Sequence, residues 1–149
     1  LGERVGFPVI DGIAVCDVFF IGSFRGVDGV LGTALLNSVI CLMVAEVVAR
    51  KTYGTGVAYM YGPEIRGLLM PSPYIMTSVG TALHEAFGAM RRRRILPLEQ
   101  ELVQSDRQAL DEVVLAALGL QGKYRALIYE SLLEMVQARL AKASSLERM

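Results

Sequence analysis

The sequence has few of the residues from which catalytic and metal sites are commonly built. Its 149 residues include one histidine, two cysteines and no tryptophan. Cys16 and Cys41 lie far apart in the chain, a spacing that fits neither a Cys-x-x-Cys motif nor a zinc site. We therefore expect no metal and no disulfide framework, and so little cysteine is typical of a protein of the reducing cytoplasm.

Nucleotide-binding and catalytic motifs are also missing. The glycines at positions 22, 26, 29 and 32 do not spell Gly-x-Gly-x-x-Gly, and no Lys-Ser or Lys-Thr pair follows a glycine-rich turn. His84 has Glu85 beside it, but adjacent residues of a helix point in different directions. We expect no catalytic residue and no cofactor site in this chain.

The chain has no excess of either charge, because 15 lysines and arginines balance 15 aspartates and glutamates. No long-range field would draw it to nucleic acid or to an anionic membrane, so any such binding must come from a local patch. The uncharged run at 29–45 would form a helix shorter than the ~30 Å hydrocarbon core, with Asn37 and Ser38 at its middle, which predicts no membrane contact. Apolar residues make up 53% of the chain, which predicts a folded core.

The first half of the sequence predicts a small mixed sheet around one long helix. Residues 5–10 and 13–21 are β-branched and aromatic runs separated by Asp11-Gly12, a pair typical of hairpin turns. Asp28 can cap a long, largely buried helix that runs up to Arg50 and Lys51. Residues 57–61 and 68–70 then return to strand chemistry. The apolar stripe of the long helix comprises Val30, Leu31, Leu35, either Ile40 or Val39, Met43, Val47 and Val48.

After Pro71-Ser72-Pro73 the pattern predicts helices over 77–90, 106–118 and 123–143, with Asp106 as a cap and Gly119 at a Schellman-type stop. The fold class is therefore α+β: a small mixed sheet with a long buried helix, followed by a helical C-terminal segment of about three helices. The prolines separate a 1–73 α/β unit from a 74–149 helical segment packed on it. A first residue other than methionine indicates a piece of a longer protein.

Two groups of residues could contact a partner. The junction at Arg50-Lys51-Thr52-Tyr53-Gly54-Thr55-Gly56 combines cations, a phenol, hydroxyls and exposed backbone N–H groups, which suits phosphate and base-edge contact; the alternative is an ordinary helix C-cap. The second group is four consecutive arginines, which surround a helix end and could bind phosphates; the alternative is a solvated surface that mixes them with glutamates. These four are Arg91, Arg92, Arg93 and Arg94.

Several short motifs occur in a characteristic order. Leu35-Leu36-Asn37-Ser38 precedes an apolar helix, a Gly-Thr-Gly turn, a strand, Gly-Pro-Glu-Ile-Arg-Gly at 62–67 and Leu69-Met70-Pro71-Ser72-Pro73. Arg107-x-x-Leu110-Asp111, Leu118-Gly119-Leu120, Ile128-Tyr129 and Arg139 follow. Together, over roughly residues 12–143, they resemble the C-terminal target-recognition region, of TaqI-like specificity, of adenine-specific N-6 DNA methyltransferases from restriction-modification systems.

The resemblance implies a division of labour within a longer enzyme. Such enzymes hold the extruded adenine with an Asn/Asp-Pro-Pro-Tyr/Phe tetrapeptide, whereas none of the five prolines here adjoins another. The missing N-terminal catalytic domain would bind S-adenosylmethionine and transfer the methyl group, while this chain would bind double-stranded DNA and supply specificity in a prokaryotic cytoplasm. The neutral net charge predicts weak DNA binding by the chain alone. The residues expected to face DNA include Arg25, Arg50, Lys51, Tyr53 and Thr55.

One alternative function belongs to a different class. The apolar stripes at 79–90 and 127–140 could pack against a partner chain or a second copy, which would make the chain a helical interaction or oligomerisation module without DNA contact. The sequence leaves open the oligomeric state, the bases recognised and whether the parent enzyme also cleaves DNA.

Overall fold

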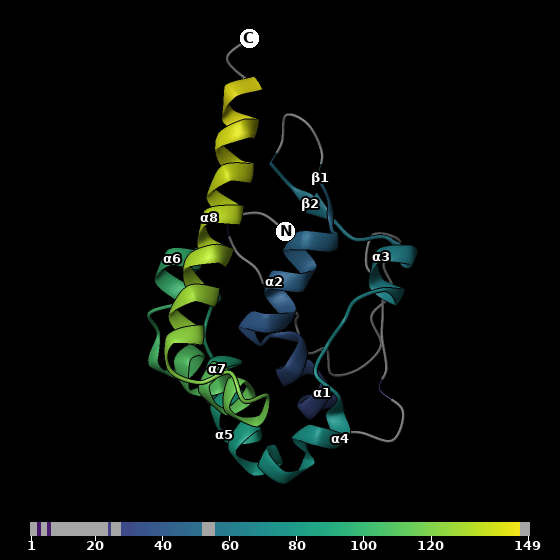
Figure 1. The fold of residues 1–149 in the computed structure, drawn as a ribbon, viewed down its shortest axis with the longest axis vertical. Coiled ribbons are helices and arrows are strands. Elements are labelled where there is room, and N and C mark those ends of the chain that lie inside the picture. The colour runs from purple at the N-terminus through teal and green to yellow at the C-terminus, as the bar shows by residue number, and fades with distance from the viewer. Residues whose placement is uncertain (1–2, 4–5, 7–23, 25–27, 52–55, 147–149) are drawn as a thin grey trace.

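The chain, described from a computed structural model, is mostly helical, with one two-stranded antiparallel hairpin and a long C-terminal helix (Figure 1). The structure describes residues 3, 6, 24, 28–51 and 56–146. In chain order the elements are α1 (Gly29–Leu36), α2 (Val39–Val48), β1 (Arg50–Lys51), β2 (Ala58–Tyr59), α3 (Gly62–Arg66), α4 (Pro73–Met76), the 3-10 turn η1 (Thr77–Val79), α5 (Gly80–Met90), α6 (Leu98–Glu101), α7 (Ser105–Ala117) and α8 (Lys123–Leu146).

Sheet structure in the described residues is limited to the β1–β2 hairpin. β2 falls within the predicted strand at 57–61, which is confirmed in its centre, whereas residues 68–70 form no strand. The predicted hairpin at 5–10 and 13–21 lies outside the described residues. The part of the chain that the structure describes is therefore more helical than the predicted α+β balance.

The predicted long helix is instead two helices, α1 and α2, which meet at an angle of 64° around Asn37 and Ser38. Asp28 caps α1 as predicted, because its carboxylate accepts a hydrogen bond from the Leu31 N–H at 3.0 Å. The Asn37 amide donates to a carbonyl of the preceding turn, and the Ser38 hydroxyl does the same. Short polar side chains that bond local backbone in this way compete with helix continuation, so the bend falls at these two residues.

The bend changes which residues of α2 face the core. Val47, which a single continuous helix would bury, is 61% exposed, so its assignment to the buried stripe is wrong. Val39, one of the two alternatives predicted at its position in the stripe, is fully buried, and so is Leu42, which the predicted stripe did not include. The predicted stripe assumes one unbroken helix. Because the chain bends between α1 and α2, the residues of α2 that face the core are not those that continue the spacing of α1.

Two side chains of α7 hold the bend from opposite sides. Arg107 donates to the carbonyl of Asn37, at the end of α1. Asp111 accepts from the N–H of Val39, the first residue of α2, at 2.7 Å. Helix ends need such partners because their last carbonyls and first N–H groups have none within the helix. From α8, the Tyr129 hydroxyl donates to the other oxygen of Asp111 at 2.8 Å, so three helices meet at this joint.

Apolar packing surrounds the joint on both sides. One cluster joins α1 to α5 and α7, and a second joins α2 to α6, α7 and α8. The stripes predicted on α5 and α8 thus pack largely inside the chain, although Leu127 remains 52% exposed. The buried members of the first cluster are Leu31, Ala34, Leu35, Leu83, Phe87, Met90, Leu110 and Val114; those of the second are Val39, Leu42, Leu98, Leu102, Leu115, Leu132 and Val136.

The three predicted C-terminal helices are confirmed as α5, α7 and α8. α7 ends in the predicted Schellman motif: the Leu120 N–H donates to the Leu115 carbonyl at 2.8 Å, and Gly119 has a φ of 71°. α7 begins one residue before Asp106, which therefore lies in its first turn rather than at its cap.

No single helix among the described residues is long and apolar enough to cross a membrane. α1 and α2 meet that criterion only as a bent pair, by length and composition.

The core assignment predicts unequal effects of two substitutions on the same helix. Leu42→Ala should lower the free energy of unfolding by about 2–5 kcal/mol, because it leaves a cavity in the second cluster. Val47→Ala should change it by less than about 0.5 kcal/mol, because Val47 is largely exposed. Urea denaturation followed by circular dichroism measures both, and equal effects would contradict the bend.

Candidate nucleic-acid interface

The β1–β2 hairpin presents one cation and one aromatic ring on the same face. Arg50 lies opposite Tyr59 and Lys51 lies opposite Ala58 in an antiparallel register. Because side chains directly opposite each other share a face of the sheet, Arg50 and Tyr59 point together, and both are exposed. Ala58 is buried on the other face, so the hairpin has an inner and an outer side.

A second tyrosine extends the outer side of the hairpin. Tyr61 follows β2 and is half exposed, and its ring lies 6.4 Å from that of Tyr59 with an interplanar angle of 24°. The guanidinium carbon of Arg50 lies 5.4 Å from the centre of the Tyr61 ring, within cation–π range. Exposed aromatic rings beside a guanidinium form a surface suited to nucleic-acid bases and phosphates.

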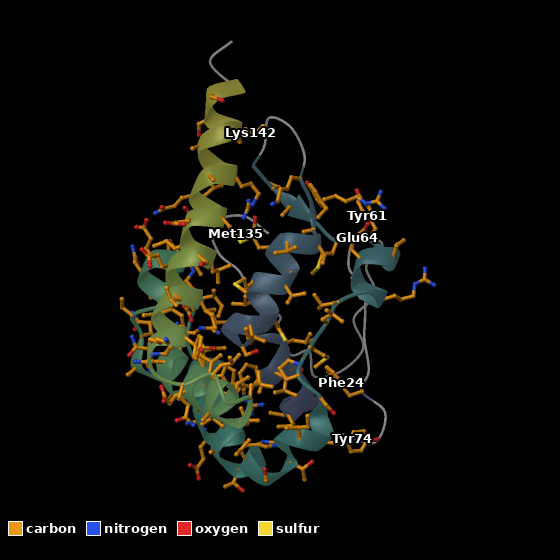
Figure 2. All side chains as sticks on the ribbon, viewed as in Figure 1. Phe24, Tyr61, Glu64, Tyr74, Met135 and Lys142 are labelled. Atoms are coloured by element: carbon orange, nitrogen blue, oxygen red, sulfur yellow. The ribbon has the colours of Figure 1, made fainter. Side chains whose placement is uncertain are left out.

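Glu64 of α3 fixes this arrangement. Its Oε1 accepts from Arg50 Nε at 2.6 Å, and its Oε2 accepts from the Tyr61 N–H at 3.0 Å. Figure 2 shows Tyr61 and Glu64 close together where β2 leads into α3. The Arg50 guanidinium holds the pKa of Glu64 below its ordinary value, so this carboxylate is ionised at neutral pH. We call Arg50, Tyr59, Tyr61 and Glu64 the hairpin patch.

A buried ion pair ties the base of the hairpin to two helices. Arg139 of α8 donates to both carboxylate oxygens of Glu46 on α2, at 2.7 and 3.0 Å, and also to the carbonyl of Gly56. Gly56 has a φ of 62°, and a Cβ there would lie 3.0 Å from the Cβ of Ala143. The returning strand therefore lies against α8 at a position where only glycine fits.

Lys51 lies on the inner side of the hairpin, although the sequence placed it with Arg50. Its ammonium is 3.8 Å from Glu46 Oε1, while its side chain is 46% exposed. Arg50 and Lys51 thus point to opposite sides of one strand. Arg25, Tyr53 and Thr55, the other residues predicted at this junction, lie outside the described residues.

The four arginines that follow α5 divide into two kinds. Arg91, Arg92 and Arg94 are exposed. Arg93 instead donates to both oxygens of Asp106 and both of Glu101, at 2.6–2.9 Å. Figure 1 shows α5 at the opposite end of the molecule from the hairpin, so the two predicted groups belong to separate surfaces.

The pairing of Arg93 changes the acidity of its partners. Its hydrogen bonds to Asp106 and Glu101 raise the pKa of the guanidinium, and the hydrogen bond to Asp106 lowers the pKa of that carboxyl group. Burial works to raise the pKa of Glu101, but hydrogen bonds from Arg93 and the Leu96 N–H, together with the charge of Arg107, outweigh it and lower that pKa. Arg93 therefore anchors the segment after α5 to α6 and α7.

Within the described ranges, no group of three or more histidine, cysteine, aspartate or glutamate side chains could hold a metal ion. His84 Nε2 lies 2.9 Å from Asp28 Oδ2 at the exposed start of α1. Cys41 is buried, and burial raises the pKa of its thiol to about 11, which makes it a poor nucleophile.

Sequence reasoning missed three members of the hairpin patch. Tyr59 and Tyr61 fall at the predicted strand of residues 57–61, and their spacing of two residues, which brings both rings to one side of a strand, is the signal that could have found them. Glu64 follows Tyr61 by three residues, which is the spacing of a capping box at the start of a helix. The sequence Tyr-Gly-Pro-Glu therefore already indicated that the Glu64 side chain could bond the backbone of Tyr61.

No protein-family model, curated protein or solved structure matches the chain. Its function has to be inferred from the hairpin patch, from the buried contacts that support it and from the order of its sequence motifs.

The buried pair predicts a large effect of removing one partner. Arg139→Met should lower the free energy of unfolding by about 3–5 kcal/mol, because the buried Glu46 would lose both hydrogen bonds from the guanidinium and keep only the more distant charge of Lys51. The double variant Glu46→Leu, Arg139→Met should recover most of that loss, because neither charge remains. Urea denaturation of both variants measures this. If the free energy of unfolding of Arg139→Met lies within about 1 kcal/mol of the wild-type value, the ion pair does not have the assigned role.

The acid pair around Arg93 predicts loss of stability at low pH. Because the pKa values of Glu101 and Asp106 are lowered below 4.5 and 3.8, their stabilisation is complete above those values and is lost as pH falls through the lower folded values. Asp106→Asn should therefore flatten the fall in urea midpoint between about pH 6 and about pH 3. Glu112→Gln, in the exposed pair with Arg125, is the control and should leave the slope unchanged.

Proposed function

We propose that this chain is the DNA target-recognition part of an adenine-specific DNA methyltransferase of a restriction-modification system. It supplies duplex binding and sequence specificity, and a catalytic domain of the same parent chain binds S-adenosylmethionine and transfers the methyl group. The parent acts in a prokaryotic cytoplasm. The proposal includes two expectations from the sequence: a small mixed sheet in the first part of the chain, and a division into a 1–73 α/β unit and a 74–149 helical segment.

The observation that carries the proposal is the exposed hairpin patch on a rigid base. A two-stranded ribbon is one of the elements that the major groove of B-DNA admits. Arg50 supplies charge and paired donors, and the two tyrosines supply surfaces for stacking. The clamp of Arg139 on Glu46 and Gly56 keeps this ribbon fixed against α2 and α8.

The motifs that suggested the family resemblance also meet in space. Asn37 and Ser38 form the joint that Arg107, Asp111 and Tyr129 hold, and the terminal motif arginine, Arg139, holds the hairpin. Motifs spread over the whole chain thus serve one architecture, which supports treating them as a single pattern rather than as chance matches.

The alternative, a helical interaction module, has less support. The stripes that would bind a partner pack inside the chain through Leu83, Phe87, Met90, Leu132 and Val136.

A titration of the isotope-labelled 149-residue chain with duplex DNA at low salt, followed by NMR, tests the proposal. Signals of β1, β2 and α3 should shift, and Arg50→Gln should weaken binding. Arg125→Gln, an identical charge change on α8, should not. In the complete enzyme, Arg50→Gln should likewise reduce site-specific methylation. Shifts confined to regions away from the hairpin, or no shifts, would overturn the proposal.

A further inference from the structure

The hairpin patch holds one guanidinium in a fixed orientation. Glu64 Oε1 binds Arg50 at Nε, and the Tyr61 ring lies 5.4 Å from its central carbon. The first contact fixes the direction of the side chain, and the second restricts its position beside the ring. Glu64 is itself held by the N–H of Tyr61, so Arg50 is supported by a side chain that the backbone positions.

Within the described part of the chain, the terminal nitrogens of Arg50 are its available donors. Among the residues that the structure describes, none accepts a hydrogen bond from Arg50 Nη1 or Nη2, and the side chain is 61% exposed. Two parallel N–H groups match a ligand with two neighbouring acceptors. In the major groove, guanine offers such a pair in O6 and N7, whereas adenine offers one acceptor and one donor.

Charge favours the base over a phosphate at this position. The Glu64 carboxylate lies 2.6 Å from Arg50 Nε and largely neutralises its charge. A phosphate brought to the free edge would also be repelled by Glu64, whereas the neutral edge of a base would not. Preorganisation of the arginine lowers the entropy lost on binding, which is what a base-specific contact requires.

We propose that Arg50 recognises a guanine of the target duplex through its two terminal nitrogens, with Glu64 as the positioning residue. This inference rests on the proposed function, because it assigns part of the specificity of the same patch. It makes a G·C base pair part of the sequence that the parent enzyme recognises.

The test compares three duplexes of equal length: alternating G·C, the same sequence with 7-deazaguanine, which lacks N7, and alternating A·T. NMR titrations of the 149-residue chain at low salt give the affinities. The wild type should bind the G·C duplex at least about fivefold more tightly than the other two, the lower end expected of a bidentate arginine–guanine contact. Arg50→Lys keeps the charge but not the paired donors and should abolish this preference.

Glu64→Gln separates orientation from charge. It should raise affinity for all three duplexes, because a negative charge is removed, and narrow the preference for G·C, because Arg50 loses its support. Equal wild-type affinity for the G·C and 7-deazaguanine duplexes, with shifts at the hairpin, would overturn the guanine contact and leave DNA recognition standing. Absence of hairpin shifts with every duplex would overturn both.

Discussion

The structure depends on how a bent chain satisfies its own backbone inside a core. At Asn37 and Ser38 the end of one helix and the start of the next are buried together, where water cannot reach the unpaired carbonyls and N–H groups. Arg107 and Asp111, one turn apart on α7, supply the missing donor and acceptor. Without them the burial of two polar helix ends would be strongly unfavourable, because each unpaired group loses its hydrogen bonds to water.

The same logic operates at the other end of α2. Glu46, near its C-terminus, is held by Arg139, and the N-terminus is held by Asp111. α2 thus has a buried contact with a charged side chain at each end, one from α7 and one from α8. Such contacts add little net stability over apolar packing, but they define one position for the helix. The hairpin follows directly after α2, so the position of the hairpin depends on both contacts.

The parts of this architecture that the sequence predicted are local. Asp28 as a cap, the stop at Gly119 and the three C-terminal helices depend on residues within a few positions of one another. The bend and the two charged contacts do not: Asp111 bonds a residue 72 positions away and Arg139 one 93 positions away. Glu46 and Arg107 look like ordinary surface charges in the sequence, because nothing nearby indicates that a distant helix will cover them. Of the four residues of the hairpin patch, the sequence predicted Arg50 alone. Arg50 was evident from its neighbours in the chain, whereas Glu64 contacts it from 14 positions away.

The glycine at the base of the hairpin has a consequence for how such a protein can diverge. At Gly56 the backbone lies against α8 in a conformation that other residues rarely adopt. Substitution of Gly56 would therefore displace the hairpin from α8. The exposed side chains beyond it carry no such constraint. Selection could therefore exchange Arg50, Tyr59 or Tyr61 for other residues and create new preferences for DNA while the scaffold beneath stays unchanged.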